Sequence, residues 1–284
     1  ASINPTFDDY RLIHEDVERG DKINTEKFFG KRLAKRVEML GPQPSTTLEE
    51  MYGRLFDALK AGPIIAVIDS ETSLPPASFL KRFKKNKRLA ERGKDTEGSY
   101  GTEKAKLHSE NLRWIVGELE RSGSILVMIN QTRDRIGFAA KFNPKTRAGG
   151  RALEFYATVQ MWSAVGGQVR KKIGEKKRQL GIYASIQVKR TRLTGKDRSV
   201  RVPIYHSAGI DDLGSMVDWL IEEGHWKKSK GVIVAPDLDL EGRRESLVRK
   251  IEEGNKEREL RAITNDVWNQ IEEACVIRRK SRYA

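Results

Sequence analysis

The stretch IIAVID at residues 64–69 decides the fold class. It is aliphatic without alternation, and it lies between Gly-Pro at residues 62–63 and Pro-Pro at residues 75–76. A second stretch, SILVMIN at residues 124–130, has the same character. Continuous aliphatic runs of this length are typical of strands in a parallel sheet with helices on both faces. The two stretches therefore predict two buried parallel strands.

Amphipathic patterns surround these strands. Residues 48–59 and 107–119 have apolar side chains at helical spacing, and each segment precedes one of the strands. This order of helices and strands indicates an α/β domain. Residues 152–163, 182–190 and 200–206 instead alternate apolar and polar side chains, which predicts an antiparallel extension of the sheet with one solvated face.

The pattern also predicts two domains, a core over residues 1–208 and a small C-terminal domain over residues 209–284. Near the end of the chain, apolar residues recur every three or four positions, which indicates one amphipathic helix. We expect this helix to pack against residues 245–251 through Leu260, Ile263, Val267, Ile271 and Cys275.

The composition limits the function classes. A net charge of +14 over 284 residues points to a polyanionic partner such as nucleic acid, although a basic surface without a specific partner is the alternative. A hydrophobic fraction of 38% is too high for a disordered chain. No apolar run approaches the roughly 20 residues that span a bilayer, so we expect a cytoplasmic protein without a membrane partner. The single cysteine, Cys275, excludes an internal disulfide and suits a reducing compartment.

Polar residues follow both predicted strands. Asp69 and Ser70 end the first strand, where a carboxylate at the edge of an α/β sheet can hold Mg²⁺. Asn130 and Gln131 end the second, where an amide can sense a γ-phosphate. For each pair, an ordinary cap at the end of a strand is the alternative.

Two basic segments lie close to these strand ends. Residues 132–151 combine six Lys or Arg with two Phe and end near the pair Gly149 and Gly150, which suits single-stranded nucleic acid. Residues 81–94 contain eight Lys or Arg against Glu91 alone. This second segment predicts either another polyanion-binding loop or a solvated surface.

Other chemistries have less support. Arg190 and Arg192 end an alternating strand, where they could stabilise phosphate charge or form part of a nucleic-acid patch. The four histidines have no metal-ligand spacing, and the chain contains no G-x-S-x-G motif.

Taken together, these segments resemble the RecA-type recombinases of bacteria and their phages. Residues 64–70 are similar to the Walker B strand of that family, and residues 129–137 (INQTRDRIG) are similar to the signature that leads into its second DNA-binding loop. Residues 146–156 (TRAGGRALEFY) match the end of that loop. The resemblance covers residues 7–226 and implies a RecA-like ATPase core, mostly parallel with an antiparallel extension, followed by a small C-terminal domain.

The resemblance implies a nucleotide site. Asp69 would hold Mg²⁺, Asp69 and Ser70 would bind Mg²⁺–ATP, and Asp8 would lie near the adenine. The catalytic part would consist of the γ-phosphate sensor and two basic residues that reach the nucleotide of the adjacent protomer: Gln131, Arg190 and Arg192.

The resemblance also implies DNA and self-assembly contacts. Phe155 would lie at a filament interface. Single-stranded DNA would be contacted by Lys106, Ser109, Arg113, Arg133, Arg135, Gly149 and Gly150.

The sequence departs from the family in its phosphate-binding elements. A P-loop requires G-x-x-x-x-G-K-[ST], and the Gly-Lys pairs at residues 30–31, 93–94 and 195–196 all lack it. The family's catalytic Glu is expected just before residue 7, where the chain has Asn4 and Pro5. We expect a fragment whose front portion lies upstream; a variant that cannot hydrolyse ATP unaided is the alternative.

The resemblance therefore implies an ATP-dependent recombinase that assembles as a filament on single-stranded DNA and pairs it with double-stranded DNA. Such a protein would be a DNA-dependent ATPase in DNA recombination and repair if a P-loop is supplied upstream. One alternative is a RecA-fold accessory or mediator protein without ATPase activity, and another is a replicative helicase domain.

Overall fold

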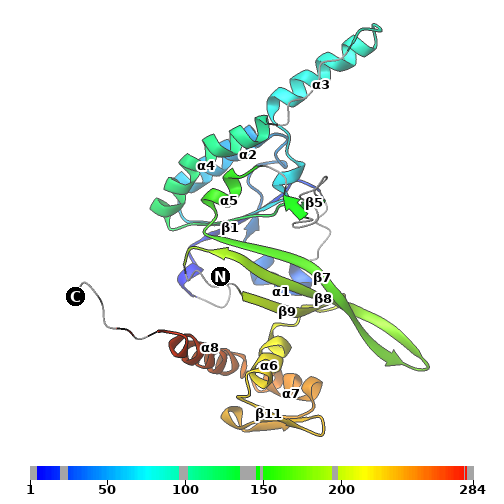
Figure 1. Ribbon diagram of the computed structural model, residues 1–284, viewed down its shortest axis with the longest axis vertical. Helices are drawn as coiled ribbons and strands as arrows, with labels where there is room; N and C mark the ends of the chain where they lie inside the picture. Colours follow the sequence, from blue (N-terminus) through cyan, green and yellow to red (C-terminus); the bar gives the residue numbers. More distant parts are fainter. Residues whose placement is uncertain are drawn as a thin grey trace. The chain divides into compact units, whose positions relative to one another are not determined.

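The computed structural model describes residues 5–19, 25–95, 102–134, 145–147, 150–193, 198–277 and 279. The chain divides into two compact units, Ala1–Thr158 and Val159–Ala284, and each is described by itself. Figure 1 shows helices beside a sheet in the first unit, and a long hairpin with a group of small elements in the second. The domain boundary expected after residue 208 stays a prediction.

The first unit is built on a parallel sheet with the strand order β2-β1-β3-β4. Its strands are β1 (Arg11–Asp16), β2 (Val37–Glu38), β3 (Ile64–Asp69) and β4 (Ile125–Met128). In register, Asp16 lies opposite Asp69, and Ile68 lies opposite Met128. The two strands expected from the sequence are therefore adjacent and parallel. Their parallel arrangement was predicted, but the prediction that both are buried is wrong for β4, in which Ile125 and Val127 are exposed.

Helices α2 (Leu48–Lys60) and α4 (Glu103–Ser122) pack against each other in this unit (Figure 1). The Oγ1 of Thr47 caps α2 by accepting a hydrogen bond from the backbone N–H of Glu50 at 3.2 Å. One face of α2 is buried because its apolar residues recur at helical spacing. The core of the unit includes Leu48, Met51, Leu55, Ile64, Ile68 and Ile115.

The remaining helices of the first unit are α1 (Thr25–Ala34), α3 (Ala77–Ala90) and α5 (Ala152–Tyr156), with short 3₁₀ turns η1 (Pro5–Phe7) and η2 (Glu71–Ser73). Helix α5 corrects the prediction of a strand over residues 152–163. Its residues 152, 153 and 156 pack against the core, which favours a helical turn over the alternating strand pattern. A short hairpin of β5 (Thr132–Asp134) and β6 (Lys145–Arg147) completes the unit.

The second unit begins with an antiparallel sheet in the order β10-β9-β8-β7. Its strands are β7 (Val159–Ile173), β8 (Lys176–Thr191), β9 (Arg198–Tyr205) and β10 (Gly209–Ile210). The close pairing of β8 and β9 requires glycine at position 181, because a Cβ there would lie 2.1 Å from the backbone O of Ile204. The expected antiparallel strands are present, but they form a separate sheet and do not extend the parallel one, and β7 and β8 are longer than the sequence indicated.

A group of short elements follows this sheet. The helices are α6 (Asp212–Glu222), α7 (Arg244–Glu253) and α8 (Glu257–Ala274), and the strands are β11 (Lys227–Ser229), β12 (Val232–Ala235) and β13 (Leu240–Gly242), with a 3₁₀ turn η4 (Pro236–Leu238). They share one core that contains Val217, Trp226, Ile233, Leu247 and Leu260. Helix α8 packs chiefly on α6, and it shares the core with α7.

Cys275 differs from the prediction that it belongs to this core. It is the C-terminal capping residue of α8, where the helix ends, and its side chain is exposed. Separately, no helix among the described residues has the length and apolar character needed to cross a membrane.

Candidate functional site

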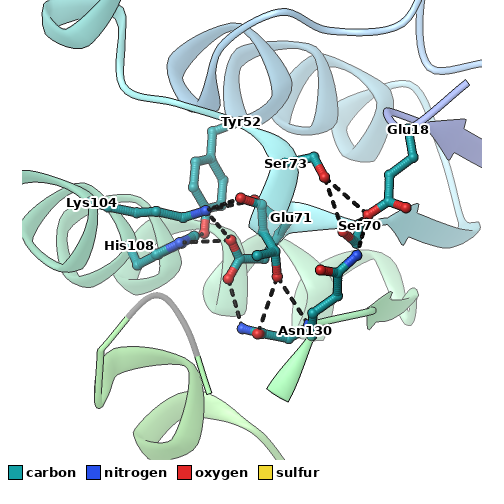
Figure 2. Close-up of polar contacts among 10 residues, drawn as sticks. Glu18, Tyr52, Ser70, Glu71, Ser73, Lys104, His108 and Asn130 are labelled. Carbon is teal, nitrogen blue, oxygen red and sulfur yellow. Dashed lines mark hydrogen bonds and ion pairs between the residues drawn. The ribbon is translucent and has the colours of Figure 1, made fainter. Parts of the chain in front are cut away.

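The carboxyl ends of β1, β3 and β4 meet at one edge of the parallel sheet, and polar side chains converge there (Figure 2). Glu18 comes from the segment after β1, Ser70 follows β3, and Gln131 follows β4. The loops at the carboxyl edge of a parallel sheet are where α/β proteins bind their ligands. This edge is the candidate site.

Glu18 is the centre of the first group of contacts. Its Oε1 accepts hydrogen bonds from Ser70 Oγ, from Ser73 Oγ at 2.9 Å and from Gln131 Nε2 at 2.7 Å. The hydrogen bond from Ser70, followed by that from Ser73, lowers the pKa of Glu18, although desolvation and the nearby Asp16 act in the opposite direction. Glu18 is therefore a carboxylate at neutral pH, and it connects all three strand ends.

Glu71 is the centre of a second, buried group (Figure 2). Its Oε2 lies 2.7 Å from Lys104 Nζ and 3.4 Å from His108 Nε2, and its Oε1 accepts a hydrogen bond of 2.7 Å from Asn130 Nδ2. His108 Nδ1 in turn lies 2.7 Å from the hydroxyl of Tyr52. Glu71 and His108 are both fully buried, so this group connects η2, α4, α2 and the end of β4 away from solvent.

The pKa values in this buried group follow from its charges. Burial alone would raise the pKa of Glu71, but the hydrogen bond and charge of His108, together with Lys104, lower it below the ordinary value. Burial, with the Glu71 charge, raises the pKa of Tyr52. The group therefore contains an ionised Glu71 beside a neutral Tyr52.

Asn130 and Thr72 hold Gln131 in place. The Oγ1 of Thr72 donates to Asn130 Oδ1 at 3.2 Å and accepts from the backbone N–H of Gln131 at 3.0 Å. The backbone N–H of Glu71 also donates to the carbonyl of Ile129 at 3.1 Å. The side chain of Gln131 is thus directed to Glu18 by contacts that lead back to the buried Glu71.

Asp69 lies within the same edge. Its backbone carbonyl accepts a hydrogen bond of 2.7 Å from the N–H of Val17, and its partner in register is Asp16. Among the described residues, no three His, Cys, Asp or Glu side chains are grouped so that they could hold a metal ion by themselves. Mg²⁺ commonly takes only one or two carboxylates and completes its shell with substrate phosphates and water, so a single carboxylate at this edge is compatible with it. The expected role of Asp69 and Ser70 in holding Mg²⁺ stays a prediction.

Gln131 is followed directly by the hairpin of β5 and β6, in which Thr132 pairs with Arg147. Arg133 lies in β5, whereas Arg135 and Gly149 lie outside the described residues. Gly150 has a φ of +77°, and a Cβ on it would lie 2.7 Å from the Cβ of Ala105 in α4. Only glycine suits this combination of backbone conformation and close approach.

Helix α4 presents three of the predicted DNA-binding residues on one side. Lys106, Ser109 and Arg113 are three and four positions apart, so they share a face of the helix. Lys106 and Arg113 are exposed, whereas His108 and Leu112 are buried on the other side. The contact of Gly150 with Ala105 brings the segment after the hairpin to the start of this face.

Four other predicted residues take no part in these contacts. Asp8 precedes β1 and so lies at the opposite end of that strand from Glu18, where its carboxylate is 3.6 Å from Arg36. Arg190 and Arg192 are exposed and belong to the second unit. Phe155 is 62% exposed on α5. Their expected roles toward adenine, nucleotide and filament stay predictions.

The sequence interpretation missed Glu18, Glu71, Lys104 and His108. It looked for a carboxylate at Asn4 and Pro5, where the structure has the start of η1 and Asn4 lies outside the described residues. The strand β1 reads RLIHED, in which Glu15 is buried and accepts a hydrogen bond of 2.7 Å from the N–H of Ser45. Because β1 contains several polar residues, the sequence did not indicate a strand there. The apolar pair Leu12 and Ile13 was the only local feature that pointed to one.

Comparison with known proteins agrees with this geometry. The RecA N-terminal domain matches residues 88–211, which include α4, the β5–β6 hairpin and the sheet of β7 to β9. The protein RecA of Thermus thermophilus is 27% identical over 209 residues, or 72% of this chain and 56% of the relative. RecA of Trichodesmium erythraeum is 34% identical over 167 residues, which cover 59% of the chain and 41% of the relative. The chain therefore shows distant homology to the RecA family over much of its length.

Another RecA protein, from Caldanaerobacter subterraneus subsp. tengcongensis, is 28% identical over 262 residues, which cover 87% of this chain and 69% of that RecA. The resemblance seen in the sequence is thereby confirmed at the level of the family. The chain spans about half the length of the first RecA relatives that it matches, at 56% and 39% of their residues. The activity and partners of a whole RecA protein are therefore proposals for this chain.

Proposed function

We propose that this protein binds single-stranded DNA in an ATP-dependent manner and forms filaments for homologous pairing and strand exchange. One observation carries the proposal. Gln131 Nε2 donates a hydrogen bond of 2.7 Å to Glu18 Oε1 at the sheet edge, and the next residue, Thr132, begins the β5–β6 hairpin. A change at the edge is therefore transmitted to this hairpin through a single residue.

The nucleotide part of the proposal rests on the carboxyl edge of the sheet. Mg²⁺–ATP supplies a phosphoanhydride bond and the charge of its phosphates. Asp69 and Ser70 would contact the metal ion with a carboxylate and a hydroxyl. Glu18, which is ionised, is suited to accept a proton from a water molecule, and the amide of Gln131 is suited to donate a hydrogen bond to a phosphate oxygen.

The coupling follows from the contacts of Gln131. Its side-chain N–H donates a hydrogen bond to Glu18, so a phosphate oxygen would compete with Glu18 for the same donor. Thr72 and Asn130 hold its backbone and neighbouring side chain, which limits the adjustment to the side chain and to the hairpin that follows. Nucleotide binding would thus alter the hairpin that starts at Thr132.

The DNA part rests on α4 and the hairpin. Lys106 and Arg113 give one face of α4 two exposed cations, and Ser109 between them offers a hydroxyl. Lys and Arg neutralise phosphates, whereas hydroxyl and backbone N–H groups position the strand. The approach of Gly150 to Ala105 joins this face to the basic segment of residues 132–151.

A DNA-binding accessory or mediator protein of the same fold is a second candidate. The observation that favours it is the sequence pattern of the chain, whose three Gly-Lys pairs do not form a G-x-x-x-x-G-K-[ST] motif. Such a protein would use the α4 face without any nucleotide response.

A binding measurement separates the two candidates. The affinity of the full chain for a fluorescent 30-nucleotide single strand is measured by anisotropy with and without ATP and Mg²⁺. The proposed recombinase function predicts that ATP tightens binding. Equal affinity under both conditions would support the accessory protein and contradict ATP dependence.

A further inference from the structure

Lys104 is a largely buried cation at the start of α4 that neither the proposed nucleotide site nor the single-strand face uses. Its side chain is 18% exposed. The Nζ of Lys104 donates hydrogen bonds to the carbonyls of Glu71 at 2.7 Å and of Thr72 at 3.0 Å, and it lies 2.7 Å from Glu71 Oε2 (Figure 2). An ammonium group has three donors, so acceptors from the turn η2 suffice to satisfy all of them.

The ion pair of Lys104 and Glu71 is not explained by stability alone. Glu71 is fully buried, and the cost of removing two charges from water is commonly as large as their attraction. Apolar side chains of similar size often give a fold of equal stability. What the ion pair supplies is a fixed position for α4 relative to η2, because neither charge can leave while the other stays buried.

The turn η2 contacts both members of the Glu18–Gln131 pair. The Oγ of Ser73, at the end of the turn, donates a hydrogen bond of 2.9 Å to Glu18 Oε1. The Oγ1 of Thr72, in its middle, accepts a hydrogen bond of 3.0 Å from the backbone N–H of Gln131. The position of η2 therefore affects where the side chains of Glu18 and Gln131 meet.

The first turn of α4 joins η2 to the proposed single-strand face. Lys104 contacts η2, whereas Lys106 is exposed two positions later, about 200° around the helix axis. The backbone N–H of Lys106 donates a hydrogen bond of 3.1 Å to the carbonyl of Thr102, so this turn is closed. A shift of the turn toward a phosphate held by Lys106 would therefore also move Lys104.

His108 extends the same contact along α4. It is four positions after Lys104 and so lies on the same side of the helix. Its Nε2 is 3.4 Å from Glu71 Oε2, and its Nδ1 is 2.7 Å from the hydroxyl of Tyr52 in α2. Because two side chains of α4 contact one carboxylate oxygen, a movement of α4 changes the surroundings of Glu71.

We propose that Lys104 is a positioning residue: through its ion pair with Glu71 and the turn η2, it transmits the binding of a single strand on α4 to the Glu18–Gln131 contact. The proposal rests on the proposed function and deepens it by naming a regulatory connection that does not pass through the β5–β6 hairpin. Coupling between two sites is reciprocal, so a nucleotide that draws Gln131 away from Glu18 would in turn alter the affinity of α4 for DNA.

The test compares two double variants of the full chain, and both leave the net charge unchanged. The buried-pair variant carries Lys104→Met and Glu71→Gln, which keeps the approximate size of both side chains and leaves no unpaired charge buried. The control variant carries Lys35→Met and Glu120→Gln, which removes the same two charges from exposed positions of the first unit. Unfolding in urea establishes that each variant is folded.

A third variant, Thr72→Val, decides the question if the buried-pair variant does not fold. Valine has the shape of threonine but lacks the hydroxyl that accepts the backbone N–H of Gln131. This substitution removes the last step of the connection without changing any charge.

The side-chain amide of Gln131 reports the connection directly. The full chain is prepared with ¹⁵N-labelled glutamine, and the signal of Gln131 is identified by its loss in Gln131→Ala. The amide proton in the 2.7 Å hydrogen bond to Glu18 resonates downfield of a solvent-exposed one, so the signal reports this contact. Spectra are recorded without nucleotide while a short oligothymidine is added, and anisotropy of the same oligonucleotide with a fluorescent label gives the affinity.

We expect the oligonucleotide to shift the Gln131 signal in the unaltered chain and in the control variant. In the buried-pair variant and in Thr72→Val, the signal should no longer move when the oligonucleotide binds. The affinity of both should stay within about threefold of the unaltered chain, because the cations of the α4 face and the net charge are kept or change by nothing that faces DNA.

Three results would overturn the proposal: a Gln131 signal that does not move in the unaltered chain when DNA binds, a signal that moves equally in the buried-pair variant or in Thr72→Val, or a response that is lost equally in the control variant. The spectra contain no nucleotide, so the ATP response of single-strand affinity tests the proposed function separately. A chain that responds to ATP without a DNA-dependent shift of Gln131 keeps the proposed function and lacks this connection. A chain that does not bind the oligonucleotide contradicts both.

Discussion

The amide of Gln131 donates a hydrogen bond of 2.7 Å to the carboxylate of Glu18, although 113 residues separate them in the sequence. This contact joins the ends of β1 and β4 across β3, the central strand between them. A phosphate oxygen of a bound nucleotide would have to replace Glu18 as the acceptor of this hydrogen bond. The position of the Gln131 side chain would then depend on whether nucleotide is bound.

Glu18→Gln tests the role of the carboxylate. Glutamine keeps an oxygen that can accept the hydrogen bonds of Ser70 and Gln131, but it cannot take a proton from water. We expect DNA-stimulated ATP hydrolysis to fall by roughly 10²- to 10⁴-fold, while ATP still tightens binding to single-stranded DNA. Phosphate release reports the rate, with Glu26→Gln on exposed α1 as the matched control. A hydrolysis rate equal to that of the control would exclude Glu18 from the reaction.

Gly150→Ala tests the junction between the hairpin segment and α4. The new methyl group would meet Ala105 at 2.7 Å, and the φ of +77° disfavours alanine. We expect weaker binding of single-stranded DNA, measured by anisotropy, and partial recovery when Ala105→Gly is added to relieve the contact. Recovery in this double variant is the decisive control. Full affinity in Gly150→Ala alone would show that the junction does not shape the DNA site.

Glu71→Ala tests the buried group. Removal of this carboxylate leaves Lys104 without its closest charge partner in a largely buried position. We expect the free energy of unfolding, measured in urea, to fall by roughly 3–5 kcal/mol. The matched change Glu110→Ala, at an exposed position of α4, should alter it by less than about 0.5 kcal/mol. An equal change in the free energy of unfolding for the two substitutions would show that the buried contacts of Glu71 do not stabilise the fold.

The pH dependence of stability gives an independent test of Glu71. Its pKa is lowered in the folded protein from an ordinary value of 4.5, so its ionised form stabilises the fold above that pH. This contribution is lost as the pH falls below 4.5 toward the folded pKa. We therefore expect the difference in unfolding free energy between the unaltered chain and Glu71→Gln to narrow in that range. A difference that stays constant down to pH 3 would contradict the lowered pKa.

Part of the fold could be predicted, because continuous aliphatic runs are typical of strands in a parallel sheet. The stretch IIAVID is the central strand β3, and the residues after it and after SILVMIN form part of the candidate site. Helix α5 was mistaken for a strand because five residues are too few to establish a helical period. Its exposed Phe155 next to the partly buried Tyr156 gave an alternating pattern.

The contacts that organise the site could not be predicted in the same way. Glu18 and Gln131 come into contact because the strand order β2-β1-β3-β4 places the ends of β1 and β4 on either side of β3. Local sequence patterns do not determine the order of strands in a sheet. Glu71, Lys104 and His108 are polar residues that elsewhere would be read as solvated. Their mutual pairing offsets the cost of burying them, and this pairing depends on α4 lying next to η2.

The most direct test of the central claim is the ATP response of Gln131→Ala. The affinity for a fluorescent single strand is measured with and without ATP and Mg²⁺ in the unaltered chain, in Gln131→Ala and in the control Gln270→Ala on exposed α8. The account predicts that ATP tightens binding in the unaltered chain and in the control, and leaves it nearly unchanged in Gln131→Ala. If ATP still tightens binding in Gln131→Ala, the coupling through Gln131 is wrong.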